Sequence, residues 1–490
     1  AGMRFWKNQQ ERKLKTKTSK KKVKKKNREI MIVTWVFTLL FIGMAGYITY
    51  YSATHKQELI NNSYNGRQQI LIAQNTRGRI FSAEGEVLAR TTTDSEGKEK
   101  REYPYQNLFS HVVGYASNGR MGVEAQANYY LINTSASLSQ KAALDLNGEK
   151  YPGDDVYTTL RVDLQQVAST ALGVYQGAVI VTEPGTGKVL AMVSKPDFDP
   201  EQISDIWDEL VADEDSSILL NRVTQGLYPP GSTFKIITAL EYIRENPDIF
   251  QNYSYNCSGS IAKGPDRIQC YHGTVHGTVD FKRSFAKSCN TSFANIGLSL
   301  DKSAFGDTLE QLLFGQDLTT AFNTNVSRID VREDIPDGDM MQISIGQGTT
   351  SITPLLLNMI TCAIANEGNL MTPYVVDYVA GSAGNTVKTF SPSSYGRLMS
   401  QEEAATLKGL MTDVVEEGTA SRLKGLSYTA AGKTGSAEYG TVKGDSHAWF
   451  TGFAPADDPQ ICVTIIIEGA GAGGDYAVPI AKRIFDAYFQ

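Results

Sequence analysis

A serine and a lysine three residues apart are the first candidates for chemistry in this 490-residue chain. The stretch PPGSTFKIITAL, residues 229–240, places Ser232 after Pro-Pro-Gly and Lys235 in the apolar run that follows. That run predicts a buried helix starting near Ser232, and residues three apart share one face of a helix. Burial lowers the pKa of a lysine amine, so Lys235 could act as a base that activates the Ser232 hydroxyl. The alternative is that Ser232 only caps the helix.

Two further motifs follow Ser232 along the chain. An S-x-N motif occupies residues 288–290, 56 residues beyond Ser232, and the sequence Lys-Thr-Gly occupies residues 433–435. The Lys-Thr-Gly sequence occurs once. The S-x-x-K pattern carries little weight alone, because it recurs in settings without a catalytic context at Ser19–Lys22, Ser95–Lys98 and Ser284–Lys287.

Three cysteines and a histidine form a second candidate site. Cys257, Cys270, His276 and Cys289 make a Cys3His set, which suits a tetrahedral structural Zn²⁺. A disulfide between Cys257 and Cys270 is the first alternative, free thiols are the second, and His272 could replace His276 as the ligand. Because Cys289 is the middle residue of the S-x-N motif, a metal there would brace both residues beside it.

The N-terminal region predicts a membrane anchor. Residues 30–51 contain no charged side chain and are long enough to cross the hydrocarbon core as a helix. Residues 1–29 carry thirteen Lys/Arg against two acids, although the whole chain has a net charge of −6. The positive-inside bias predicts a cytoplasmic tail over 1–29, a single transmembrane helix over 30–51 and an external body. A basic run can also bind nucleic acid, but beside a membrane span that interpretation is disfavoured, and no nucleic-acid partner is predicted.

The external body divides into two predicted parts. Residues 52–154 are polar and irregular with short strand-like pieces, which predicts a small accessory module. Residues 155–490 contain the hairpin-like stretches GAVIVTEPGTGKVLAMVSKP and AWFTGFAPADDPQICVTIIIEG, with helical patterns between them and one at the C-terminus. We therefore predict an α+β fold, whose antiparallel sheet combines distant parts of the chain.

The ordered S-x-x-K, S-x-N and Lys-Thr-Gly motifs resemble the signature of penicillin-binding proteins and serine β-lactamases. The chain is most similar to class B penicillin-binding proteins, the monofunctional transpeptidases that cross-link peptidoglycan. The pedestal of these proteins is similar to three stretches of this chain, RGRIFSAEGEVLAR, HVVGY and GRMGVEAQANYYL. Within the first stretch, Phe81-Ser82-Ala83 departs from the Asp-Arg motif that is commoner in the family. The transpeptidase domain of these proteins is similar to three further stretches, ISIGQGTTSITPLLL, EEGTASRL and HAWFTGFAP. The implied architecture is a membrane helix, a mixed pedestal and a domain of the serine β-lactamase and DD-peptidase type.

The resemblance implies a catalytic set. Ser232 would attack the penultimate D-alanine carbonyl of a stem peptide, and Lys235 would take the hydroxyl proton. Ser288 and Lys433 would pass that proton to the leaving amine, and Asn290 would hydrogen-bond the backbone of the acyl donor.

A second set would bind the substrate. Thr434 and Ser436 would hold the terminal carboxylate, with Gly435 between them and the positive charge of Lys433 nearby. The backbone N–H groups of Ser232 and Ser436 would form the oxyanion hole.

The resemblance also implies partners. β-Lactams would acylate the same serine, the protein would lie in the bacterial cell membrane, and a SEDS-family glycan polymerase would contact the membrane helix and pedestal. Some family members hold zinc in the segment between S-x-x-K and S-x-N. Two alternatives remain: a catalytically idle scaffold of a wall-building complex and a membrane-anchored serine β-lactamase. Elongation, division and sporulation all stay open as roles.

Overall fold

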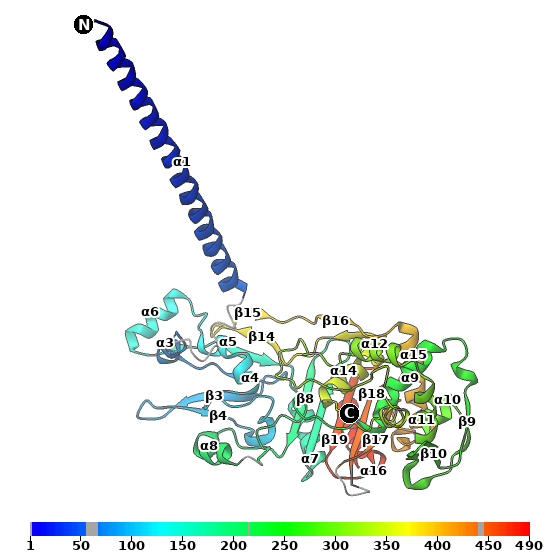
Figure 1. The fold of residues 1–490 in the computed structure, drawn as a ribbon. Coiled ribbons are helices and arrows are strands. Elements are labelled where there is room, and N and C mark those ends of the chain that lie inside the picture. The colour runs from blue at the N-terminus through cyan, green and yellow to red at the C-terminus, as the bar shows by residue number, and fades with distance from the viewer. Residues whose placement is uncertain (1, 55–66, 214–215, 440–444) are drawn as a thin grey trace. The chain divides into compact units, whose positions relative to one another are not determined.

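The N-terminal residues form one long helix, α1 (Gly2–Thr54), in a computed structural model that describes residues 2–54, 67–213, 216–439 and 445–490 (Figure 1). The helix contains one apolar stretch long enough to cross a membrane, with no part of it buried by the protein, which fits a membrane anchor. No helix was predicted over residues 1–29. The structure continues α1 through them, since Lys, Arg and Gln are good helix formers. Residues 1–68 form one unit and residues 69–490 another.

A five-stranded antiparallel sheet forms the centre of the larger unit. The two predicted hairpins are both present and pair with each other through β19 and β7, which confirms the predicted sheet built from distant segments. The order across the sheet is β17 (Ala431–Glu438), β18 (Ser446–Ala454), β19 (Ile461–Ile467), β7 (Gly177–Thr182) and β8 (Val189–Lys195).

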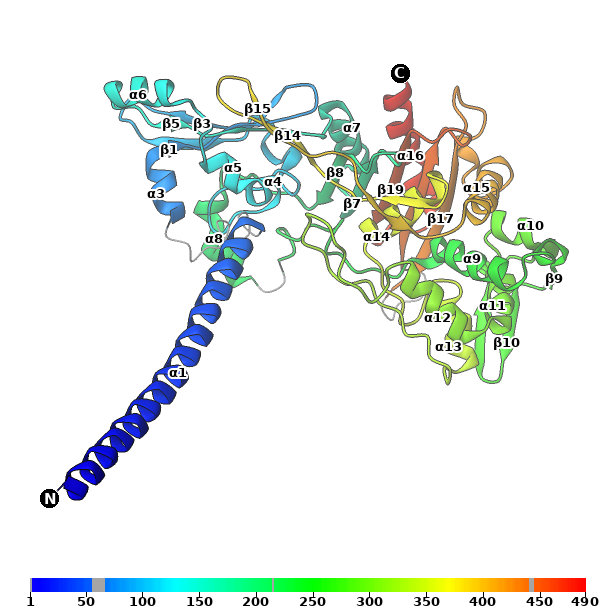
Figure 2. The same ribbon diagram turned by 90° about the horizontal axis from the view of Figure 1, so that it is seen from above.

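Helices cover both faces of this sheet, and every residue of β18, β19 and β7 is buried. The sequence of a strand covered on both faces is a nearly continuous apolar run, and the sequence of Ile461–Ile467 is of this kind. Figure 2 shows α7 (Val162–Leu172) and α16 (Gly473–Phe489) along one face and α14 (Pro354–Ala365) against the other. The fold is therefore the α+β arrangement expected.

A helical cluster extends from the α14 side of the sheet and carries two of the predicted site residues, Lys235 and Asn290. Its members are α9 (Lys235–Glu245), α10 (Phe281–Ala286), α11 (Asn290–Ser299), α12 (Lys302–Gln311), α13 (Asp337–Ile343) and α15 (Gln401–Glu416). Short hairpin-like pairs lie beside it, formed by β9 (Ser254–Cys257) with β12 (Gly277–Asp280) and by β10 (Ser260–Lys263) with β11 (Asp266–Gln269). A further pair joins β13 (Asn369–Met371) to β16 (Ser394–Arg397).

A six-stranded sheet organises the part of the chain predicted as an accessory module. Its order is β15 (Thr386–Thr389), β14 (Val376–Ala380), β6 (Asp155–Thr158), β2 (Ile80–Phe81), β3 (Val87–Thr93) and β4 (Glu99–Glu102). Two of the short strand-like pieces predicted there, β2 and β3 in the RGRIFSAEGEVLAR stretch, pair with each other. The sheet also recruits β14 and β15 from far along the chain, so it crosses the division predicted at residue 154. That division stays a prediction, and residues 55–66 of the predicted module lie outside the described residues.

Short helices complete this region: α3 (Arg67–Gln74), α4 (Gly122–Gln126), α5 (Asn128–Ile132), α6 (Leu138–Asn147) and α8 (Ile203–Ala212). A parallel pair of β1 (Asn75–Thr76) and β5 (Tyr151–Pro152) joins them.

A buried ion triad holds the six-stranded sheet against α4. The Glu124 carboxylate is fully buried and accepts from Arg77 at 2.6 Å, from Arg101 at 2.8 Å and from the Tyr103 hydroxyl at 3.2 Å. Arg77 precedes β2, Arg101 lies on β4 and Glu124 lies on α4, so the triad links three segments of this region.

We expect Glu124→Gln to lower the free energy of unfolding by about 3–5 kcal/mol, because two guanidinium groups would stay buried without their carboxylate. Urea denaturation of the full chain in detergent measures the loss. Glu96→Gln, at an exposed turn, is the control and should lie within about 0.5 kcal/mol of wild type. Equal stability of the two variants would contradict the role of the triad.

Candidate active site

Ser232 lies at a sharp entry into helix α9. The predicted helix does follow the serine, but its first turn is a 3₁₀ turn over Gly231–Phe234, and α9 itself begins at Lys235. Gly231 has φ +54°, and a Cβ there would meet the Ser436 carbonyl oxygen at 2.7 Å, so only glycine lets this turn lie against β17. The side chain of Ser232 is half-buried and lines a cavity of about 470 Å³.

Lys235 is fully buried directly beneath that turn. Its Nζ lies 2.7 Å from the Ser288 carbonyl oxygen, 2.6 Å from Asn290 Oδ1 and 3.2 Å from Ser288 Oγ. The S-x-x-K lysine is thus joined to both polar residues of the S-x-N motif. Within the described part of the chain, no hydrogen bond to the Ser232 hydroxyl is formed. Catalytic contacts are often looser before substrate binds.

Lys433, on β17, reaches the same serine from the other side. Its Nζ is fully buried, 3.0 Å from Ser288 Oγ and 3.0 Å from the Thr434 carbonyl oxygen. Ser288 therefore bridges two lysine amines. It does so in a left-handed backbone conformation, φ +55°, which is uncommon for a residue with a Cβ and is held here by these contacts.

Burial lowers the pKa of both amines. Removal from water lowers the pKa of Lys235 to about 7, although the nearby Cys289 and Cys270 thiols act in the opposite direction. The pKa of Lys433 is lowered well below its ordinary value by burial and then by repulsion from Lys235. The rings of Phe293 and Phe285 lie 5.5 Å and 5.7 Å from the two Nζ atoms and keep the surroundings apolar.

The contacts of Lys235 show how a neutral amine would fit. A neutral amine has two N–H donors and one lone pair, and two of its three neighbours, the Ser288 carbonyl and Asn290 Oδ1, can only accept. Both N–H groups therefore point to these acceptors. The lone pair is left for a hydroxyl proton, which is what a base requires.

The Lys-Thr-Gly strand forms one wall of the cavity. Thr434 exchanges a hydrogen bond with the Thr419 hydroxyl, and Ser436 Oγ accepts from the Gly473 backbone N–H at 3.3 Å. At Gly435 a Cβ would meet the Pro230 carbonyl oxygen at 2.9 Å, so glycine allows β17 to pack against the turn before Ser232. Together these residues present two hydroxyl groups in the cavity that Ser232 lines.

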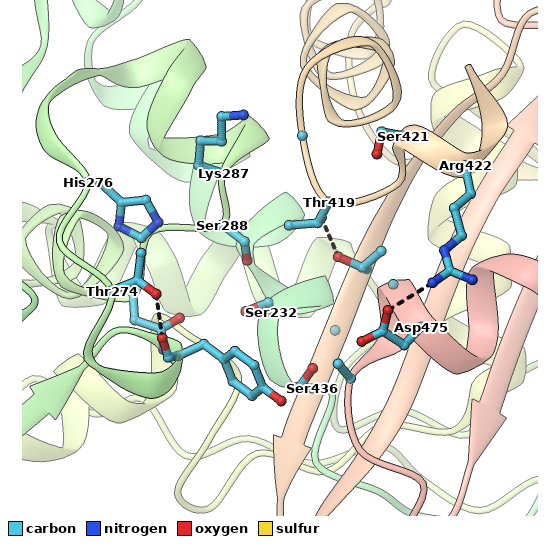
Figure 3. A pocket seen from close by; sticks show the side chains of 17 residues that line it. Ser232, Thr274, His276, Lys287, Ser288, Thr419, Ser421, Arg422, Ser436 and Asp475 are labelled. Atoms are coloured by element: carbon cyan, nitrogen blue, oxygen red, sulfur yellow. Dashed lines mark hydrogen bonds and ion pairs between the residues drawn. The ribbon is translucent and has the colours of Figure 1, made fainter. Parts of the chain in front are cut away.

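The cavity has further walls that sequence motifs did not single out. Figure 3 shows Thr274 and His276 on one side of Ser232 and Ser288, and Arg422 and Asp475 on the opposite side. Arg422 lies within the EEGTASRL stretch, outside the three catalytic motifs, and Asp475 lies in the first turn of α16. Neither forms a recurring chemical pattern in the sequence, since their segments lie 53 residues apart and only folding brings them together.

The predicted metal ligands also come together. The Sγ atoms of Cys257 and Cys270 lie 3.7 Å apart, as do those of Cys270 and Cys289, and His276 Nδ1 lies 3.5 Å from Cys257 Sγ. All four ligand atoms fall within 4.8 Å of one another. Cys257, Cys270 and Cys289 are not joined by a disulfide, and a hydrogen bond with Cys289 lowers the pKa of the Cys270 thiol to about 4. The exposed His272 is not in this cluster.

The family model of the penicillin binding protein transpeptidase domain matches residues 177–486, and the model of the penicillin binding protein A dimerisation domain matches residues 77–156. The chain is a class B penicillin-binding protein. Peptidoglycan D,D-transpeptidase PbpA of Mycolicibacterium smegmatis is 32% identical over 451 residues, which cover 86% of this chain and 91% of the relative.

Solved structures agree with this membership. This penicillin-binding protein is similar to the D,D-transpeptidase domain of a peptidoglycan glycosyltransferase from Eggerthella lenta, with a TM-score of 0.77, 29% identity and coverage of 85% of this chain and 98% of the other. It is equally similar, with a TM-score of 0.77, 28% identity and coverage of 85% and 99%, to an imipenem acyl-enzyme complex of penicillin-binding protein A from M. tuberculosis.

The pKa of Lys235 gives this penicillin-binding protein a testable pH dependence. With the neutral Lys235 amine as the base, the rate of acylation by a β-lactam should fall about tenfold per pH unit below about 7 and level off above it. Stopped-flow measurement with a fluorescent penicillin between pH 5 and 9 tests this. Lys282→Ala, at a surface lysine paired with Asp413, should leave the profile unchanged. A rate independent of pH over this range would contradict the assignment of Lys235 as base.

Proposed function

We propose that this chain is a peptidoglycan D,D-transpeptidase that forms an acyl-enzyme on Ser232. The observation that carries the proposal is the buried network in which Lys235 and Lys433 share the Ser288 hydroxyl beside Ser232. Relatives named peptidoglycan D,D-transpeptidases support the substrate, and the acyl-enzyme complexes of a similar structure support the intermediate.

Acylation would begin with a D-alanyl-D-alanine end lying along β17. The substrate carboxylate would meet the Thr434 and Ser436 hydroxyls, and Asn290 would hold the peptide backbone on the other side. Ser232 Oγ would attack the penultimate carbonyl carbon while its proton moves to Lys235. The backbone N–H groups of Ser232 and Ser436 would stabilise the oxyanion, each contributing about 3–4 kcal/mol.

Release of D-alanine and cross-linking would use the Lys433 amine together with that of Lys235. Ser288, between the two lysines, can pass a proton from Lys235 toward the departing D-alanine nitrogen, because it contacts both Nζ atoms. An amine of a second stem peptide would then attack the acyl carbon. The new C–N bond would replace the ester C–O bond, and the amine proton would return to Ser232 Oγ.

The complete network favours this enzyme over a catalytically idle scaffold, since two fully buried lysines cost stability without chemistry to use them. A serine β-lactamase would in addition need a device for rapid deacylation. D-Alanine release from a pentapeptide separates the enzyme from a scaffold, and the lifetime of the penicillin adduct separates it from a β-lactamase.

Labelling with a fluorescent penicillin tests the assignment of Ser232. The full chain in detergent should form a covalent adduct that survives denaturing electrophoresis, and Ser232→Ala should form none. Ser95→Ala is a matched control, because Ser95 begins the same S-x-x-K pattern in an exposed turn. Labelling that survives in Ser232→Ala would overturn the proposal.

We also propose that Cys257, Cys270, His276 and Cys289 hold a structural zinc ion. A tetrahedral zinc with bonds of about 2.3 Å to sulfur and about 2.0 Å to nitrogen has edges of roughly 3.8 Å and 3.5 Å. The observed separations of 3.7 Å, 3.7 Å and 3.5 Å fit these edges. A disulfide would need sulfurs about 2.05 Å apart. Bound zinc would fix Cys289 between Ser288 and Asn290 and so hold the S-x-N motif in place.

Elemental analysis of the full chain, purified without added metal, tests this site. We expect one zinc per chain, and we expect Cys270→Ser to lower the zinc content at least tenfold. Cys362→Ser is the control, because Cys362 is buried elsewhere, beside Thr182. Zinc-free protein whose mass is 2 Da lower than that of the reduced chain would favour the disulfide instead.

The anchor and partner are proposed together. We infer a single-pass protein of the bacterial cell membrane with residues 1–29 in the cytoplasm and the catalytic domain outside, from the charge asymmetry around residues 30–51. A SEDS-family glycan polymerase is the proposed partner of the membrane helix and of the module over 52–154. Co-purification of that polymerase with the full chain, and its loss when residues 1–51 are replaced by another anchor, would support the pairing.

A further inference from the structure

An exposed ion pair forms the end of the active-site cavity that lies beyond the Lys-Thr-Gly strand. Arg422 Nη2 lies 3.1 Å from Asp475 Oδ1, and both residues line the same cavity as Ser232 (Figure 3). The side chains are 56% and 65% exposed. An exposed pair of this kind contributes only about 0–1 kcal/mol to stability, so a ligand can separate it at little cost.

Both side chains have unused hydrogen-bonding capacity. Among the described residues, this contact is the one hydrogen bond that either side chain makes. A guanidinium carries five N–H donors and a carboxylate about four acceptor positions, so most of each group faces the cavity or solvent. The other charged side chain in the lining is Lys287, which is bound to the Glu417 carbonyl oxygen on the opposite side. The pair is therefore a site with a positive half and a negative half.

The position of the Arg422–Asp475 ion pair connects it with the departing D-alanine and with the acceptor amine that replaces it. Arg422 and Asp475 lie beyond Ser436, one of the two hydroxyls proposed for the terminal carboxylate of the donor, as seen from Ser288 and His276, and Thr434 lines the same cavity. The departing D-alanine carries an amine and a carboxylate on the same carbon. An attacking amine must enter where that amine departs. A carboxylate on the same carbon as the attacking amine then lies at this end of the cavity, which Arg422 and Asp475 line.

We propose that Arg422 and Asp475 select an acceptor whose attacking amine shares its carbon with a carboxylate. The inference rests on the proposed transpeptidase function and narrows its substrate class. Arg422 binds the acceptor carboxylate through two parallel N–H bonds. Asp475 pairs with the acceptor ammonium, which gives one proton to the solvent in the open cavity and then attacks as the neutral amine. The acceptor is then a stem peptide with a diamino dicarboxylic acid, which has a free amino acid end. A lysine side chain offers only the ammonium and leaves Arg422 unmatched.

Competition between two small acceptors tests this selection. The full chain in detergent is acylated with a thioester of an N-acylated D-alanine, whose leaving thiol cannot serve as an amine acceptor. Transfer to D-alanine and to D-alaninamide is measured by mass spectrometry at a series of concentrations. Comparing the ratio of the two transfer rates between proteins cancels the different basicity of the two amines.

Arg422→Gln should lower the ratio of D-alanine to D-alaninamide transfer about tenfold, by raising the concentration of D-alanine that gives half-maximal transfer. Arg422→Glu should lower it further, because a carboxylate there repels the acceptor carboxylate. Asp475→Asn should slow transfer to both acceptors and leave their ratio within about twofold. Lys424→Ala is the matched control, because it removes a positive charge two residues away that pairs with Glu416 and does not line the cavity.

Penicillin labelling separates the possible failures. If the wild type accepts neither penicillin nor the thioester, the proposed function itself is wrong. If Arg422→Gln is acylated at the wild-type rate and keeps the wild-type ratio, the function stands and the acceptor site is wrong. If Arg422→Gln slows acylation and keeps the ratio, Arg422 serves the donor carboxylate, which also overturns the proposal.

Discussion

Two lysine amines that share one buried serine hydroxyl are the constraint on which the rest of the structure depends. Ser288 Oγ lies 3.2 Å from Lys235 Nζ and 3.0 Å from Lys433 Nζ, and both amines are shielded from water. Two ammonium ions that close in an apolar setting would repel each other strongly, so the fold favours neutral amines. A neutral lysine beside a serine is a base, and the same burial that is unfavourable for stability supplies the reactivity.

The surrounding fold serves to bring three distant segments to this point. The turn at Gly231, the S-x-N loop and strand β17 meet because glycines at 231 and 435 permit close backbone contact. Trp449 on β18 is fully buried and donates from Nε1 to the Pro229 carbonyl oxygen at 3.0 Å, which fixes the turn that carries Ser232. The thiol cluster holds the S-x-N loop from its outer side. The site is thus rigid on three sides and open toward the cavity.

The sequence predicted the parts that depend on local pattern. The hairpins at 177–195 and 446–467 alternate apolar runs with turn residues, and the motif residues stand at fixed spacings, so their elements could be assigned without a structure. The Cys3His set was also predicted, because thiols and imidazoles with short spacing are rare. Residues 235, 288 and 433 lie in one hydrogen-bonded network, and Ser232 lines the cavity beside it without a hydrogen bond to Lys235 among the described residues.

Other features depend on tertiary contacts that no local pattern contains. The strands at 376–380 and 386–389 join the sheet of the N-terminal module, and nothing in their composition indicates that pairing. The helix over the basic tail was not predicted, because charge repulsion and helix propensity oppose each other there. Arg422 and Asp475 are ordinary charged residues in sequence, and their place at the cavity follows only from the packing of α16 against β17.

Neutron diffraction from crystals of the protein grown in D₂O at pH 9 would test the central claim most directly, because it locates the deuterons on each Nζ. Two deuterons on Lys235 Nζ and two on Lys433 Nζ, with the Lys235 lone pair directed at a serine hydroxyl, are the result expected from burial. Three deuterons on both nitrogens would show two charged amines around Ser288 and would contradict the account.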